Sequence, residues 1–225
     1  MRVYRTRPRF PSERRVSPSR ARMVCLGLVV MWWVGSTLAF AQGRFTDVLV
    51  SVVKDRVIAV TGVGPSEIDL SVGETVVNIK AQGLTALAIT STRLLGFSSQ
   101  FRHWGEQTLE VNEHVATSQV LREFCVVATD QHLYGFQETL AHWTSEALDG
   151  SERVQDVRAH GHVALIVTTE RLMGFSAFII GFHPMSLQGD ERVESIEHTG
   201  DAVLVKTSRR TLMCRSRMAD WTEMS

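Results

Sequence analysis

A unit of 39 residues recurs along most of this chain, and the repeat constrains the fold more than any single motif. Residues 90–97 (TSTRLLGF) return 39 residues later as TDQHLYGF, again as TTERLMGF, and in a more divergent form as TSRRTLMC. Three other columns keep the same step: Leu70, Leu109, Leu148, Leu187; Glu74, Glu113, Glu152, Glu191; and Val76, Val115, Val154, Val193. A period of 20 to 50 residues is typical of solenoids, propellers and arrays.

Each unit predicts four short strands and no helix. In one unit the expected strands are residues 85–90, 93–98, 107–111 and 113–119. The first strand is almost wholly apolar, as in strands buried on both faces. The second carries a glycine followed by phenylalanine: Gly96–Phe97, Gly135–Phe136 and Gly174–Phe175. We expect each phenylalanine to fill the space between neighbouring sheets, while the glycine lets the sheets approach closely.

Five hairpins between first and second strands can be counted from residue 50 to residue 214. Four-stranded units of about 40 residues, repeated radially, make a β-propeller. The sequence therefore predicts an all-β, five-bladed β-propeller over residues 42–225, whose last blade lacks its outer strand. In architecture the chain resembles the tachylectin type of five-bladed lectin. It carries neither the Trp-Asp dipeptide of WD40 repeats nor the double glycine of kelch repeats.

Residues 1–41 lie outside the repeat and have the pattern of an export signal. Residues 1–22 hold eight arginines and one glutamate, and residues 23–41 form an uncharged apolar run that ends in Ala-Phe-Ala. This pattern predicts a hydrophobic helix that serves as a signal peptide cleaved before Gln42. The run is also long enough for an uncleaved transmembrane anchor. Either way, we expect the repeats to be periplasmic or extracellular.

The charge of the repeat domain differs from that of the whole chain. The chain has 24 basic and 24 acidic residues, but residues 42–225 hold 16 basic and 23 acidic ones, a net charge of −7. Nucleic-acid binding is not expected, because it needs a basic surface. Cys125 and Cys214 fall in different strands two units apart, so we expect two buried thiols and no disulfide.

A basic residue and a glutamate recur in every unit on one side of the predicted blades. The basic column is Arg93, His132, Arg171 and Arg210, and the acidic column is Glu74, Glu113, Glu152 and Glu191. The first-to-second and third-to-fourth turns of a meander share one side of the sheet, so these columns predict a ladder of structural ion pairs. The alternative is a basic ring at the channel mouth that binds an anion.

The opposite side carries a column of aromatic residues and several histidines. The aromatic column is Trp104, Trp143, Phe182 and Trp221, and the histidines are His103, His142, His160, His162 and His183. The aromatic rings either pack between blades or stack on sugars, as in a lectin. No metal is expected, because equivalent positions on successive blades lie too far apart for bonds of about 2.1 Å.

The fourth unit breaks the repeat between its second and third strands. Phe178 and Ile180 replace Gln100/Thr139 and Arg102/Ala141, while Ile179, which matches Phe101 and Leu140, is expected in the core. A contiguous apolar patch at the surface marks an interaction site. The alternative is that this loop folds back over the channel and buries itself.

These patterns predict a non-enzymatic binding or scaffold module that acts through protein–protein contact. The chain has no Gly-x-Ser-x-Gly elbow, no phosphate loop and no carboxylate pair outside the ladder, so neither catalysis nor a cofactor is expected. The candidate contact residues are Phe178, Ile180, Phe182 and His183. The alternative function is a carbohydrate-binding, lectin-like propeller that uses Trp104, Trp143 and Trp221, with His103 and His142 beside them.

Overall fold

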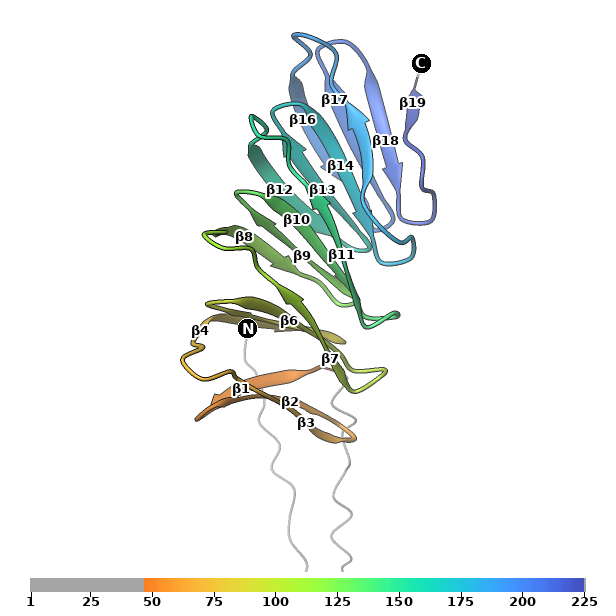
Figure 1. Cartoon of the computed structure of the whole chain (residues 1–225). Coiled ribbons are helices and arrows are strands. Elements are labelled where there is room, and N and C mark those ends of the chain that lie inside the picture. Colours follow the sequence, from red (N-terminus) through yellow and green to blue (C-terminus); the bar gives the residue numbers. More distant parts are fainter. Residues whose placement is uncertain (1–46, 225) are drawn as a thin grey trace, which may run out of the picture. The chain divides into compact units, whose positions relative to one another are not determined.

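The computed structural model describes residues 47–224, which form five antiparallel β-sheets and contain no helix (Figure 1). The predicted leader and its hydrophobic helix lie outside the described residues. The first sheet contains β1 (Leu49–Val53), β2 (Arg56–Thr61) and β3 (Gly64–Asp69). The second contains β4 (Val76–Gln82), β5 (Thr85–Thr90), β6 (Arg93–Ser98) and β7 (His103–Thr108).

The other three sheets repeat the order of the second. The third contains β8 (Val115–Val120), β9 (Phe124–Thr129), β10 (His132–Gln137) and β11 (His142–Ala147). The fourth contains β12 (Val154–His160), β13 (Val163–Thr168), β14 (Arg171–Ser176) and β15 (His183–Ser186). The fifth contains β16 (Val193–His198), β17 (Ala202–Thr207), β18 (Thr211–Arg215) and β19 (Thr222–Met224). The all-β, propeller-type architecture of five blades is confirmed.

Two details of the predicted units are wrong. The third strand spans His103–Thr108 and not residues 107–111, because Trp104 pairs with Phe97 across the hairpin. The predicted fourth strand, observed as Val115–Val120, does not close its own unit but pairs with β9 and opens the next sheet. A bulge near its start, between Val115 and Thr117, recurs at the start of β4, β12 and β16.

This shift in the sheet boundary also corrects the prediction about the incomplete blade. The last sheet is complete, because β16, which comes from the preceding unit, supplies its fourth strand. It is the first sheet that has three strands within the described residues. The position equivalent to β4 in that sheet corresponds to residues 39–45, which are outside them.

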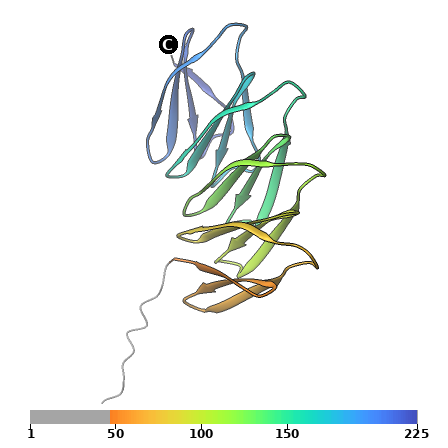
Figure 2. The same ribbon diagram turned by 90° about the vertical axis from the view of Figure 1, so that its left-hand side faces the viewer.

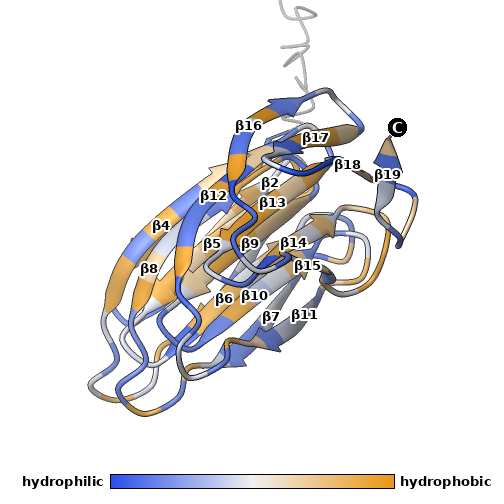
Figure 3. Ribbon diagram, turned by 90° about the horizontal axis from the view of Figure 1, so that it is seen from above, coloured by the Kyte–Doolittle hydropathy of each residue, from blue (hydrophilic) through white to orange (hydrophobic). Residues whose placement is uncertain are grey.

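Successive sheets pack face to face, so that the row of sheets follows the order of the chain (Figures 1 and 2). The main contacts between sheets join β1 to β4, β7 to β11, β8 to β12 and β13 to β17. The apolar residues gather on the middle strands of each sheet, as the hydropathy colouring in Figure 3 shows. The six residues of β5, like those of β9 and β13, are all buried.

The glycine and phenylalanine columns interlock between neighbouring sheets. A Cβ atom added to Gly96 would lie 2.5 Å from the Phe136 ring of the next sheet, and one added to Gly135 would overlap the Phe175 ring. At the last interface Cys214 replaces the phenylalanine, with its Sγ 2.5 Å from a Cβ on Gly174. Each glycine is therefore the space into which the next sheet inserts a side chain, as its spacing predicted.

Cys125 and Cys214 are free, buried thiols, as expected. Cys125 lies in the core between the second and third sheets, and Cys214 lies in the core between the fourth and fifth. Burial raises the pKa of both thiols, that of Cys214 to about 11. Both are therefore small apolar core residues in the neutral thiol form.

The interlocking predicts that Gly135→Ala is destabilising although its backbone conformation suits alanine. The added methyl group would displace the Phe175 ring in a close-packed core, and overpacking of this kind costs about 1–3 kcal/mol. Gly150→Ala is the matched control, because nothing lies within 4 Å of its added Cβ. Urea unfolding of both variants measures the difference. Equal midpoints for the two variants would contradict the interlocking.

Candidate functional site

The two ends of the strands form two rims with different chemistry. One, here called the crossing rim, carries the β1–β2, β5–β6, β9–β10, β13–β14 and β17–β18 turns. It also carries the segments that cross from one sheet to the next, such as residues 70–75. The other, here called the loop rim, carries the β6–β7, β10–β11, β14–β15 and β18–β19 loops. It also carries the tight β4–β5, β8–β9, β12–β13 and β16–β17 turns.

A buried glutamate organises the crossing rim in each of the last four sheets. The Glu152 side chain is fully buried and accepts hydrogen bonds from Arg171 Nε (2.9 Å) and Nη2 (3.0 Å). It also accepts from Thr168 Oγ1 at 2.5 Å and from the Asp149 backbone N–H at 3.1 Å. Arg171 Nη2 in addition donates to the Ala147 carbonyl oxygen of the preceding sheet at 2.8 Å. The pair therefore fastens the crossing between two sheets.

The same arrangement recurs along the ladder columns. The equivalent shortest contacts are Glu74–Arg93 at 2.8 Å, Glu113–His132 at 3.1 Å and Glu191–Arg210 at 2.9 Å. In the third sheet the Tyr134 hydroxyl group donates to Glu113 at 3.0 Å. Because each basic side chain of these columns faces a buried carboxylate, the geometry supports the structural role over an anion-binding ring.

These hydrogen bonds keep the glutamates ionised despite their burial. Burial of Glu74 opposes ionisation, but hydrogen bonds from Arg93, Thr90 and the Ser71 N–H outweigh it and lower its pKa to about 2. The Arg210 hydrogen bond is the main cause that lowers the pKa of Glu191 to about 2. The pKa values of Glu113 and Glu152 are lowered as well, against the effect of burial, by hydrogen bonds that include those from Thr129 and Arg171.

The aromatic column lies between the sheets. Trp104 and Trp143 are each 4% exposed, and their ring centroids lie 5.0 and 5.2 Å from those of Phe97 and Phe136. The Trp143 indole N–H donates to the Gly105 carbonyl oxygen of the preceding sheet at 3.0 Å. The equivalent bonds run from Trp104 to Ser66 and from Trp221 to His183. Phe182 packs on Phe175 at 4.9 Å.

This burial favours the packing alternative over sugar stacking. A stacking platform needs an open ring face, and the rings of Trp104 and Trp143 have almost none. Trp221 is half-buried and its indole N–H is bonded to the backbone at 2.9 Å. The column thus contributes inter-sheet contacts in which an apolar ring is buried and its polar N–H group is satisfied.

The histidines occupy separate places on the loop rim. His103 and His142 are exposed at the starts of β7 and β11, and His160 is exposed at the end of β12. His183 is half-buried, and burial lowers its pKa. Within residues 47–224 no three His, Cys, Asp or Glu side chains gather closely enough to hold a metal ion.

Polar side chains hold the loops of the loop rim to one another. The buried Glu138 carboxylate accepts from the Gln100 backbone N–H of the preceding sheet at 2.8 Å. The buried Gln137 amide donates in the other direction, to the carbonyl oxygens of Ser176 (2.9 Å) and Ile179 (3.0 Å) in the next sheet. These loops are therefore fixed in position before any partner binds.

The fixed loops present a row of exposed apolar side chains, which we call the loop-tip row. It consists of Phe101 (53% exposed), Leu140 (44%), Phe178 (36%), Ile180 (65%) and Met218 (44%). The expectation that Ile179 lies in the core is wrong, and its counterparts Phe101 and Leu140 are exposed. These residues occupy the tips of loops that bend away from the sheets, and Ile179 itself is half-buried.

The repeat alone does not reveal this column, because an apolar residue that recurs in each unit is typical of a core position. The exposure follows from the left-handed backbone of the following residue, with φ of 54° at Arg102 and 50° at Ala141, which the residue types do not indicate. Non-glycine residues rarely adopt this conformation, and it turns the chain sharply at the tip.

Phe178 lies in the row between Leu140 and Met218, and its ring is held by specific neighbours. Its ring centroid lies 5.0 Å from that of His162, and the Arg217 guanidinium carbon lies 4.5 Å above its face. His162 Nδ1 is 2.8 Å from Asp201 Oδ1, and its Nε2 is 3.5 Å from Glu123 Oε2. The side chains of three consecutive sheets thus support one exposed aromatic ring, so the loop does not bury itself.

The tight β12–β13 turn places His162 in this setting. Gly161 has a φ of 57°, and a Cβ atom there would overlap the Gly200 carbonyl oxygen of the next sheet. The His162 backbone N–H donates to that same oxygen at 2.9 Å. A hydrogen bond from His162 is also the main cause of the lowered pKa of Asp201.

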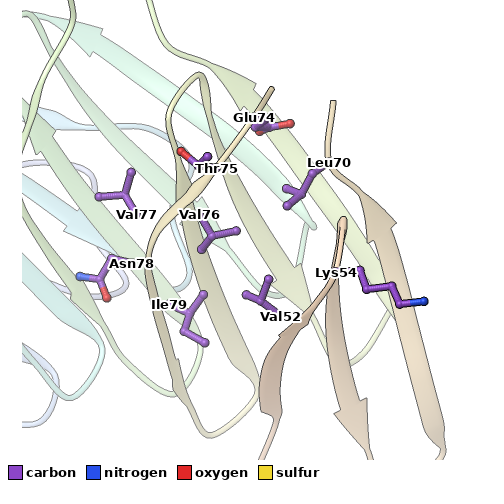
Figure 4. Close-up of a pocket in the computed structure, with 9 residues that line it drawn as sticks. All are labelled: Val52, Lys54, Leu70, Glu74, Thr75, Val76, Val77, Asn78 and Ile79. Atoms are coloured by element: carbon purple, nitrogen blue, oxygen red, sulfur yellow. The ribbon is translucent and has the colours of Figure 1, made fainter. Parts of the chain in front are cut away.

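A surface hollow of about 570 Å³ lies between the first and second sheets (Figure 4). It is lined by Val52 and Lys54 of the first sheet and by residues of the crossing and of β4, among them Glu74 and Asn78. Glu74 already bonds Arg93. The lining therefore lacks the convergent polar groups and paired titratable residues of an active site.

No described segment is a helix long and apolar enough to span a membrane. No family model matches the chain, and no curated protein matches it.

Several solved structures are similar at low identity. Prp20p from Saccharomyces cerevisiae is 8% identical over 76% of this chain and 55% of its own, with a TM-score of 0.40. The N-terminal domain of Nup159 is 9% identical over 79% and 57%, with a TM-score of 0.35. Hsv2 from Kluyveromyces lactis is 8% identical over 80% and 61%, with a TM-score of 0.38. The matches span roughly half to three-fifths of each solved chain, and likeness at this level does not bear on function.

The glutamate columns predict that Glu152→Gln is strongly destabilising. The change leaves Arg171 without its buried charged partner, and breaking such a pair costs about 3 kcal/mol. Glu194→Gln is the control, because its ion pair with Lys206 is exposed and contributes under about 1 kcal/mol. Urea unfolding compares the two, and similar losses for both variants would count against the structural role of the column.

The lowered pKa values predict acid sensitivity. The carboxylates have folded-state pKa values below the unfolded value of about 4.3, so they contribute full stability above that pH. This contribution is lost as the pH falls from about 4.5 towards 2. Glu191→Gln removes one such group. Between about pH 4.5 and 2, the unfolding free energy of this variant should therefore depend less steeply on pH than that of the unaltered chain, by about one proton. Urea unfolding at several pH values tests this, and an unchanged slope would refute it.

Proposed function

We propose that the repeat domain is an exported, non-enzymatic β-propeller module that binds a protein partner through its loop-tip row. The observation that carries this proposal is the exposed Phe178 ring, held by His162 and Arg217 on a loop whose backbone is bonded to the neighbouring sheet. Preorganised aromatic anchors of this kind dominate the energy of many protein interfaces.

The geometry of the row supports a protein partner over a small ligand. Stacked sheets lie about 10 Å apart, so tips on four successive sheets extend over roughly 30 Å. The tips Phe101, Leu140 and Met218 project singly from separate loops. A typical specific interface covers about 800 Å² on each partner, which suits an extended row of this length.

The export part of the proposal rests on the sequence alone. The arginine-rich segment, the apolar run and the Ala-Phe-Ala end of residues 1–41 are typical of a secretory leader. The net charge of −7 over residues 42–225 argues against nucleic acid as the partner. A membrane would be contacted only through residues 23–41, where they remain attached.

The proposal predicts that Phe178→Asp abolishes partner binding and leaves the fold intact. The change places a charge at the centre of the apolar contact, and loss of such an anchor costs about 2 kcal/mol or more, roughly a 30-fold drop in affinity. Cross-linking in the expressing cell, followed by tagged pull-down and quantitative mass spectrometry, measures the loss of bound partner.

Val111→Asp is the matched control. Val111 is also exposed and apolar, at 87%, but it lies on the crossing rim, between β7 and β8. The control should retain the partners of the unaltered chain. If both variants retain them equally, the loop-tip row is not the binding site.

A further inference from the structure

The row of sheets leaves one sheet face uncovered at each end within the described residues. We call the outer face of the first sheet the first end face. It contains Leu49, Ile58, Val60 and Pro65, because Val57 and Ala59 of the same strand point inward against Phe97. Leu49 and Val60 are 60% and 41% exposed.

The outer face of the fifth sheet, here called the last end face, points away from the fourth sheet. Val203, Val205, Leu212 and Cys214 point inward to the fourth sheet. The cross-strand row of Leu204, Met213 and Thr222 therefore points outward. The adjacent outward row contains Lys206 and Thr211.

All three internal glycine contacts obey one rule. The glycine of one sheet faces the following sheet and receives a side chain that the following sheet points back towards it. Gly96 with Phe136 is one example. The two end faces of the row both depart from this rule. Met213 stands in the glycine column and Val60 stands in the phenylalanine column.

The two changes compensate in size. Glycine with phenylalanine and methionine with valine have the same number of side-chain heavy atoms, so a contact between the two end faces would match the Gly96–Phe136 and Gly135–Phe175 contacts in volume. Neither end face would pack as well on a sheet that carries the usual glycine and phenylalanine. Met213 would collide with a phenylalanine in the adjoining sheet, and Val60 would leave a void above a glycine.

The neighbouring positions are complementary as well. In the internal interfaces the glycine row packs on the row that holds the phenylalanine and the tryptophan. The same alignment brings Leu204 and Thr222 opposite Leu49 and Pro65. In the row beside it, Ala128 and Leu133 pack on Ile166 and Met173. The equivalent positions place Lys206 and Thr211 opposite Ser51 and Ile58, and Glu67 pairs with Ile58 across the first sheet.

We propose that the last end face of one molecule docks on the first end face of a second copy of this chain. The contact continues the blade-to-blade interface from one molecule to the next, with Met213 against Val60 at its centre and Lys206 beside Glu67. The two faces are different, so the contact is head-to-tail and produces a ring or a chain of copies.

A second copy is favoured over the molecule's own opposite end. The first and fifth sheets lie at opposite ends of the row in both views (Figures 1 and 2). Glycine contacts interlock three of the four internal interfaces, and Glu–Arg pairs fasten three of the four crossings between sheets. Closing the row on itself would require all four interfaces to change.

Pairwise cross-linking of the full chain tests the contact. Val60→Cys and Met213→Cys are made in two differently tagged chains that carry Cys25→Ser and are purified in mild detergent. Cys125 and Cys214 remain, because both are buried. A bismaleimide of about 10 Å span, matching the spacing of stacked sheets, joins facing positions. We expect a covalent dimer that contains both tags, and its yield should rise with protein concentration.

Control variants make the result specific. Val72→Cys places a more accessible thiol on the crossing between β3 and β4, and its mixture with Met213→Cys should still give less than a tenth of the product. In a second control, the chain that carried Val60→Cys carries Leu49→Cys and Val60→Asp instead. Its mixture with the Met213→Cys chain should give no product. Absence of the two-tag dimer would overturn the proposal. So would a single chain carrying Val60→Cys and Met213→Cys that cross-links only within itself.

Discussion

The insertion of one side chain into the space above a glycine of the neighbouring sheet is the contact on which the rest of the structure depends. Gly96, Gly135 and Gly174 each receive a side chain from the next sheet, and the tryptophan indole N–H groups bond the backbone of the sheet before. Since these contacts are made at the centre of each interface, they set the distance between sheets. The positions of both rims follow from that distance.

Each rim then has a separate task. On the crossing rim, buried glutamates hold an arginine or a histidine, a threonine and a backbone N–H where the chain passes from sheet to sheet. On the loop rim, Gln137 and Glu138 hold loops of neighbouring sheets, and the tips of those loops project apolar side chains. The framework is repeated, whereas the surface it presents changes from blade to blade. Phe178, with His162 and Arg217, is the point where that change is greatest.

The repeat made the strands and their interlocking predictable, because columns 39 residues apart have the same environment. Gly135 and Phe136 could be assigned to the inter-sheet space, and Cys125 to the core, from spacing alone. The boundary between sheets could not, since Val115 fits equally well as the end of one meander or the start of the next. The exposure of Phe101 and Leu140 was also missed, because it depends on the backbone turn at Arg102 and Ala141. Phe178 was found because it breaks its column.

The most direct test of the interlocking is a double-mutant cycle between Gly135 and Phe175, two residues on facing sheets. Phe175→Leu removes the ring atoms that a Cβ at position 135 would overlap. The urea unfolding free energies of the two single variants and the double variant should therefore show that Gly135→Ala costs at least about 1 kcal/mol less in the leucine background. Additive losses, within about 0.5 kcal/mol, would contradict the account.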